Sequence, residues 1–147
     1  MGNASIPTRL PQVDDSVAML LARIAPVSRS GVGLVSAART TTTSTAAIDV
    51  GGARVLTVFL DVTAVPGSGG LSVSVDMQDP ITGQWSNCLF NSAPVVASVG
   101  LTQYQMPGGT VSSTACNVAS LTPNVRIRVT HSTAVSYTYS VSWVLSP

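Results

Sequence analysis

The chain has 147 residues, a formal net charge of +1, and only 9% charged residues. A chain of this length buries about 68–70% of the surface that it exposes when unfolded, so one domain can fold without a metal or a disulfide. All basic residues are Arg and all acidic residues are Asp. The absence of Lys and Glu, which are strong helix formers, argues against a helical domain. The near-zero charge disfavours nucleic-acid binding, and no apolar run approaches the ~20 residues of a membrane span.

The first region, residues 1–47, is predicted to be an extended N-terminal arm. Three prolines interrupt its first part, and proline lacks the backbone donor that a helix or strand interior needs. The Asp14-Asp15-Ser16 sequence predicts a short helix at 15–25, capped by these side chains and apolar on one face. An early strand is expected near 32–40. Asp14 and Asp15 stand where a secretory signal would carry positive charge, so we expect no export signal.

Two interpretations of this arm remain open. It is either a poorly ordered tail or an arm whose apolar stripe docks on another subunit. The second is favoured because apolar residues are costly to leave in water. The candidate contact residues are the members of this stripe and the nearby arginines, namely Arg9, Leu20, Leu21, Arg23, Ile24 and Arg29.

Strand patterns begin in the second region, residues 48–147. Within 53–63, Leu56, Val58, Leu60 and Val62 share one face, while Val55 and Phe59 share the other. This arrangement predicts a central strand covered on both sides. Residues 71–78 alternate between apolar and polar, and the five-residue sequence Asp79–Gly83 predicts a hairpin loop. With that loop, Gln84 faces Gln78 and Trp85 faces Met77.

A second hairpin is predicted at the end of the chain. Val125, Ile127 and Val129 alternate with polar residues, and the apolar positions from Tyr137 to Leu145 do the same. A three-residue loop, Ser132–Ala134, would set Val129 opposite Tyr137. Together with one or two strands between 95 and 121, these segments predict an all-β antiparallel β-sandwich, Ig-like or jelly-roll-like, of about seven or eight strands.

Residue types that carry enzyme chemistry are sparse. His131 is the only histidine, no G-x-S-x-G nucleophile motif is present, and Gly31-Val32-Gly33 lacks the third glycine of a dinucleotide loop. Two cysteines and one histidine cannot complete a structural zinc site. We therefore expect no enzyme, no cofactor and no metal site.

Two pairs of residues have two interpretations each. Cys88 and Cys116 form either a disulfide or two buried thiols. Arg126 and Arg128 project from one strand face, where they either bind an acidic partner or pair with Asp61 or Asp76 on a neighbouring strand. The second interpretation of the arginines is favoured.

One set of segments resembles a known family. The set consists of the sequence from Ile48 to Ala64, the strand 71–78, Gly83-Gln84-Trp85, Val125-Arg126-Ile127-Arg128-Val129 and the closing aromatic strand. Together these segments resemble the head decoration (cement) proteins of tailed bacteriophages. The resemblance covers about residues 48–145. It implies a β-sandwich that binds the outside of a phage capsid lattice and reinforces it, with no catalytic residues.

This resemblance also implies partners and a location. The partners would be the major capsid protein and neighbouring copies of the chain, as a homo-oligomer on the capsid surface of the virion, after synthesis in the host cytoplasm. Two alternatives remain. One is another virion component, such as a coat jelly roll, a tail-tube module or a fibre module. The other is a surface β-sandwich that binds carbohydrate or protein.

Overall fold

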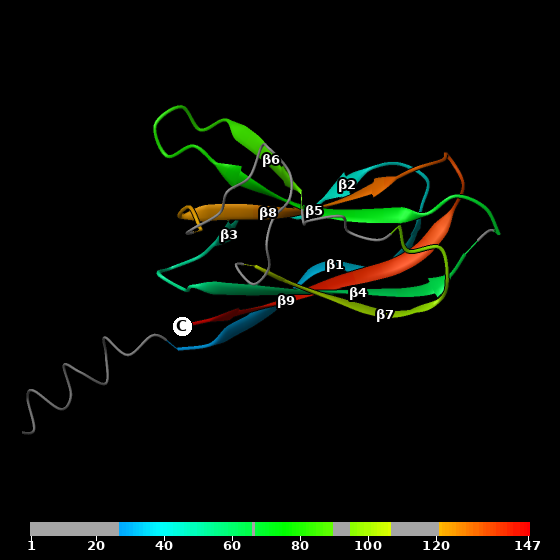
Figure 1. The fold of residues 1–147 in the computed structure, drawn as a ribbon, viewed down its shortest axis with the longest axis horizontal. Helices are drawn as coiled ribbons and strands as arrows, with labels where there is room; N and C mark the ends of the chain where they lie inside the picture. The colour runs from blue at the N-terminus through cyan, green and yellow to red at the C-terminus, as the bar shows by residue number, and fades with distance from the viewer. Residues whose placement is uncertain (1–26, 66, 90–94, 107–120) are drawn as a thin grey trace, which may run out of the picture.

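The structure is a computed structural model, and it describes residues 27–65, 67–89, 95–106 and 121–147. These residues form two antiparallel sheets that lie one above the other (Figure 1). The predicted all-β antiparallel sandwich is confirmed. The described residues contain nine strands, two of which have only two residues each. The helix expected at 15–25 lies outside the described residues.

Each sheet combines strands from distant parts of the chain. The four-stranded sheet has the order β1 (Arg29–Arg39), β9 (Tyr137–Ser146), β4 (Val55–Ala64) and β7 (Gly100–Met106). The five-stranded sheet has the order β2 (Thr43–Ser44), β8 (Asn124–His131), β5 (Leu71–Gln78) and β6 (Trp85–Leu89), and β3 (Ile48–Asp49) also pairs with β8. The strand β7 lies in the region where one or two strands were expected, and Val96 forms an isolated bridge with Leu71.

The core lies between the two sheets. Apolar side chains at every second position point inward, as the period of a strand requires. On β4 these are the four residues predicted from the sequence, on β8 they are Val125, Ile127 and Val129, and on β9 they include Tyr137, Tyr139 and Val141. All of these side chains are no more than 1% exposed. Their removal from water is the main favourable contribution to folding.

The strand expected near 32–40 is present as β1, which starts earlier, at Arg29. It pairs with β9 along its whole length, and β2 pairs with β8. The two sheets therefore include residues that the sequence assigned to the arm. The β1 register shifts at Leu34 on both sides, and the Arg39 guanidinium donates hydrogen bonds to the carbonyls of Val35, Ala37 and Tyr139 in this irregular stretch. Such bulges and blocked carbonyls discourage pairing of an edge strand with other chains.

The prediction that residues 53–63 form a central strand is confirmed. The strand β4 lies centrally, between β9 and β7. Val55 and Phe59, on its outer face, are only half-buried. The predicted covering of both faces is therefore not found for these two side chains.

The first predicted hairpin, β5–β6, is confirmed, but its register differs by one residue. Gln78 lies opposite Trp85, and Met77 lies opposite Ser86. The loop gains a residue because the Asp79 carboxylate accepts hydrogen bonds from Ile81 N and Thr82 Oγ1, while Asp79 N donates to the Gln84 carbonyl. Gly83 supports this closure with a left-handed φ of 70°. Trp85 consequently shares the outer face with Gln78, rather than the core face with Met77.

The second predicted hairpin is wrong. β8 lies in the five-stranded sheet and β9 lies in the four-stranded sheet, so Val129 does not pair with Tyr137. Val129 pairs instead with Thr43 and Val73, and Tyr137 pairs with Arg39. Both strands do bury the side chains that the alternation predicted. The alternation identifies the inward face of each strand, but it does not distinguish a neighbour in the same sheet from one across the core.

Candidate functional site

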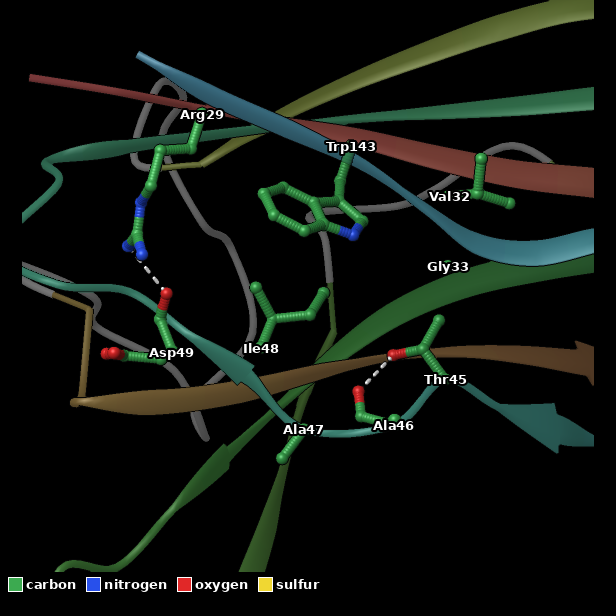
Figure 2. Close-up of a pocket in the computed structure, with 9 residues that line it drawn as sticks. All are labelled: Arg29, Val32, Gly33, Thr45, Ala46, Ala47, Ile48, Asp49 and Trp143. Carbon is green, nitrogen blue, oxygen red and sulfur yellow. Dashed lines mark hydrogen bonds between the residues drawn. The ribbon is translucent and has the colours of Figure 1, made fainter. Parts of the chain in front are cut away.

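A hollow of about 250 Å³ opens between the sheets beside β1. One wall comes from β1 and β9 of the four-stranded sheet, and the other comes from the segment that joins β2 to β3 (Figure 2). The residues that line the hollow are Arg29, Val32, Gly33, Thr45, Ala46, Ala47, Ile48, Asp49 and Trp143. The wall that β1 and β9 form cannot be predicted from sequence proximity, because its lining residues Gly33 and Trp143 are 110 positions apart.

Two glycines of β1 allow the strand to approach its neighbours closely at this hollow. A Cβ on Gly31 would lie 2.6 Å from Cζ2 of Trp143, and a Cβ on Gly33 would lie 2.7 Å from Cγ2 of Thr45. Real Cβ atoms do not pack at such distances, so these positions require glycine or a shift of the neighbours. Gly31 and Gly33 therefore pack strands and do not form a nucleotide loop.

The polar groups at the rim bind one another. Nη2 of Arg29 donates a hydrogen bond to the Asp49 carbonyl at 2.7 Å, as Figure 2 shows. Oδ1 of Asp49 accepts a hydrogen bond from Gly51 N at 2.9 Å. Arg29, a sequence candidate for a partner contact, thus lies at the edge of the hollow. The other candidates, Arg9, Leu20, Leu21, Arg23 and Ile24, lie outside the described residues.

A second polar cluster lies on the outer face of the five-stranded sheet. Nε of Arg126 lies 2.9 Å from Oδ2 of Asp76, and Nη2 of Arg128 lies 2.9 Å from Oδ1 of the same carboxylate. Asp76 is only 2% exposed, and the guanidinium of Arg126 lies 4.6 Å from the ring centroid of Trp85. The arginines pair with Asp76, which was one of the two carboxylates considered from the sequence. This burial of Asp76 had no signal in the sequence.

His131 lies at the end of β8, next to two tyrosines of β9. Its Nε2 lies 3.2 Å from the Tyr139 hydroxyl, and its ring meets the Tyr137 ring edge-on at 5.5 Å. Burial lowers the pKa of His131, and the positive charge of Arg39 lowers it further, while a hydrogen bond with the Val135 backbone opposes both effects. The Tyr137 hydroxyl donates to the Ser68 carbonyl. These contacts join the two sheets at one end of the sandwich.

The outer face of the four-stranded sheet has a different character. Its side chains are those that alternate with the core residues of β4, β7 and β9, and we call this surface the hydroxyl face. Ser142 is exposed at its middle, opposite Phe59 on one side and Val32 on the other. The residues of the hydroxyl face are Val32, Val55, Thr57, Phe59, Asp61, Leu101, Gln103, Gln105, Thr138, Ser140, Ser142 and Val144. Asp61 is the one charged member.

The remaining candidates are not resolved by these contacts. Cys88 belongs to β6, but Cys116 lies outside the described residues, so the disulfide and the two-thiol interpretations both stay open. The described part of the chain has no group of three or more potential metal ligands. In the same part of the chain, no helix is long and apolar enough to cross a membrane.

Comparison with known proteins does not assign the chain. No protein-family model matches it, and a search of curated proteins found no match either.

Proposed function

We propose that this chain is a non-enzymatic structural protein of a phage virion that binds the outside of the capsid lattice and reinforces it. The observation that supports this proposal is the hydroxyl face. It spans the width of a four-stranded sheet and carries a single charged side chain, Asp61. The cores of protein–protein interfaces are similarly depleted of charged residues.

The composition of the hydroxyl face suits binding to another protein surface. Phe59, Val55 and Val144 are half-buried, so an incoming surface would complete the removal of their side chains from water. The Ser, Thr and Gln side chains around them can donate or accept hydrogen bonds at low desolvation cost. Because the face has little charge, binding to the shell should depend only weakly on salt.

Reinforcement of a shell follows from preferential binding. A protein that binds the assembled lattice better than its separate subunits shifts the equilibrium towards the assembled state. Each contact contributes modestly, but many copies act on one shell. Leu101, at the β7 edge of the hydroxyl face, is 66% exposed and adds apolar area to this contact.

Purified virions provide the first test. Mass spectrometry should detect the chain at a copy number comparable with that of the major capsid protein. A handful of copies would favour a tail or fibre module, and absence from virions would overturn the virion function and favour a surface-binding sandwich.

Reconstitution provides the second test. Particles stripped of the protein should rupture at a lower temperature, and adding the protein back should restore the rupture temperature over a range of ionic strength. Ser142→Arg, at the middle of the hydroxyl face, should prevent this restoration, whereas Ser86→Arg, at an exposed serine of β6, should not. No restoration by the unaltered protein would contradict reinforcement.

A further inference from the structure

We propose that the hollow beside β1 receives aliphatic side chains from the N-terminal segment of a second copy of this chain. The side chains are those of the apolar stripe, Leu20, Leu21 and Ile24. The contact would link copies to one another, separately from the hydroxyl face. This inference rests on the proposed function in one respect: binding to a capsid lattice would hold copies of the chain side by side.

The chemistry of the hollow favours an apolar occupant. Six of its nine lining residues are apolar or glycine, and the indole of Trp143 lies across from Ile48 in Figure 2. The polar groups inside the hollow are used within the chain, since Thr45 Oγ1 donates to the Ala46 carbonyl and accepts from Ile127 N. The Arg29 guanidinium, which donates through Nη2 to the Asp49 carbonyl, lies at the exposed rim. The interior therefore suits an aliphatic group better than a sugar or an anion.

The size of the hollow agrees with this class of occupant. A closed cavity of about 150 Å³ inside a protein holds a molecule of benzene. The hollow of about 250 Å³ thus has room for one or two branched aliphatic side chains. Its opening lies beside the edge strand β1, along which an incoming segment can run.

The length of chain before the described residues allows such a link. Twenty-six residues precede Val27, and Arg29 itself lines the hollow. Five residues lie between Leu21 and Val27. With the helix predicted at 15–25, the chain would span about 6 Å from Leu21 to Ala25 and about 7 Å from Ala25 to Val27. Together these lengths are enough to reach a neighbouring copy in contact with the first.

A second copy is a better donor than the same copy. The hollow lies at the start of β1, so the same chain would have to reverse within a few residues to enter it. Pro26 favours an extended conformation of Ala25, and no glycine occurs between Gly2 and Gly31 to make a tight reversal. A segment that continues away from its own sandwich can reach a neighbour.

The full-length protein in solution provides the test, without any shell. Self-association is measured by sedimentation equilibrium, and the environment of the hollow is measured by fluorescence in a Trp85→Phe background, where Trp143 is the remaining tryptophan. Raising the concentration should shift the Trp143 emission to shorter wavelength as dimers or larger species form. The Leu20→Ser/Leu21→Ser double variant should weaken association at least tenfold and remove the shift.

A variant of the receiving side tests the hollow independently. Ile48→Phe enlarges the side chain that points toward Trp143 in Figure 2, so it should occupy the hollow and weaken association by a similar factor. A thermal melt of the same variant checks that the chain still folds. Two matched controls should leave association unchanged. Ala134→Phe adds the same ring at an exposed alanine between β8 and β9, and Ile81→Ser removes an exposed isoleucine from the loop between β5 and β6.

Each other outcome overturns a distinct part of the proposal. A Trp143 shift that the double variant removes but that does not depend on concentration would assign the hollow to the segment of the same chain. Association that is insensitive to a folded Ile48→Phe variant would overturn the hollow as the receiving site. If shells take up the unaltered protein and neither variant changes self-association, this inference fails alone. If the variants behave as expected but shells take up no protein, the proposed function fails alone.

Discussion

The outer faces of the two sheets deal with polar groups in opposite ways. On the five-stranded sheet, Asp76 is 2% exposed and both of its oxygens are engaged by Arg126 and Arg128. On the four-stranded sheet, the hydroxyl face presents mostly neutral side chains, such as the exposed Ser142, and Asp61 is its one charged member. A cluster whose charges already pair with one another has less to offer a partner than a neutral surface with free hydroxyls. The comparison supports the proposal that the four-stranded sheet is the docking side, while the paired charges of the five-stranded sheet serve its own packing.

The largest expected effect separates the core from the hydroxyl face. Ile127→Asp places a charge at a side chain that is 0% exposed, between apolar neighbours. We expect a loss of more than about 4 kcal/mol in the free energy of unfolding, enough to prevent folding. Thr138→Asp, on the hydroxyl face, should change it by less than about 0.5 kcal/mol. Circular dichroism and thermal melts measure both. Equal damage would mean that the hydroxyl face is covered, and the comparison between the faces would fail.

The next effect compares one aspartate on each outer face. Asp76→Asn removes the buried charge that two guanidiniums share, and it should lower the free energy of unfolding by about 3 kcal/mol. Asp61→Asn, at a half-buried carboxylate of the hydroxyl face, should change it by less than about 0.5 kcal/mol. Urea titrations of the two variants give both values. A large loss for Asp61→Asn alone would reverse the roles assigned to the two faces.

Local patterns in the sequence were sufficient to predict the inward faces of the strands. The alternation of Val125, Ile127 and Val129 is a property of neighbouring residues, because successive side chains of a strand point to opposite sides. The same alternation was not sufficient for the pairing of β8 with β9. Two strands that face each other across the core show the same alternation as two strands that pair within one sheet. Which of the two arrangements forms depends on contacts between distant segments of the chain.

The candidate hollow was beyond sequence reasoning for the same reason. Its lining brings together Gly33 of β1 and Trp143 of β9, and nothing near either residue in the sequence indicates the other. The ion pairs of Arg126 and Arg128 were easier to predict from the sequence. The two arginines lie two positions apart and so share one strand face, and the chain has few carboxylates that could pair with them. The burial of Asp76 was not predictable, because burial depends on the side chains that surround Asp76 in the folded sheet.

A smaller effect is expected where the edge of the four-stranded sheet approaches Trp143. Gly31→Ala introduces a Cβ that would lie 2.6 Å from Trp143, and relief of this overlap should cost about 1–3 kcal/mol of unfolding free energy. The exposed neighbour Ser30→Ala is the control and should have little effect. Gly31→Ala combined with Trp143→Leu should lose less than the sum of the two single variants, because the smaller side chain removes the overlap. Additive losses would contradict a direct contact.

The smallest effect concerns pH, and it tests the contacts that join the sheets rather than their outer faces. His131 faces Tyr137, Tyr139 and Arg39, and burial lowers its pKa from the ordinary value of 6.5. Both folded and unfolded chains hold a neutral imidazole above pH 6.5, so the contribution of His131 is fully present there. As the pH falls below 6.5, the unfolded chain takes up the proton first, and the stability decreases until the pH has passed the folded pKa.

The window from pH 7 to pH 5 isolates this residue, because His131 is the only histidine and aspartates ordinarily titrate near ~3.9. Urea unfolding midpoints should fall over this window in the unaltered protein and stay level in His131→Gln. A rise in stability on acidification would mean that the folded state favours the charged imidazole. That result would require an acceptor, such as the Tyr139 hydroxyl or the Val135 backbone, to outweigh the effects of burial and of the Arg39 charge.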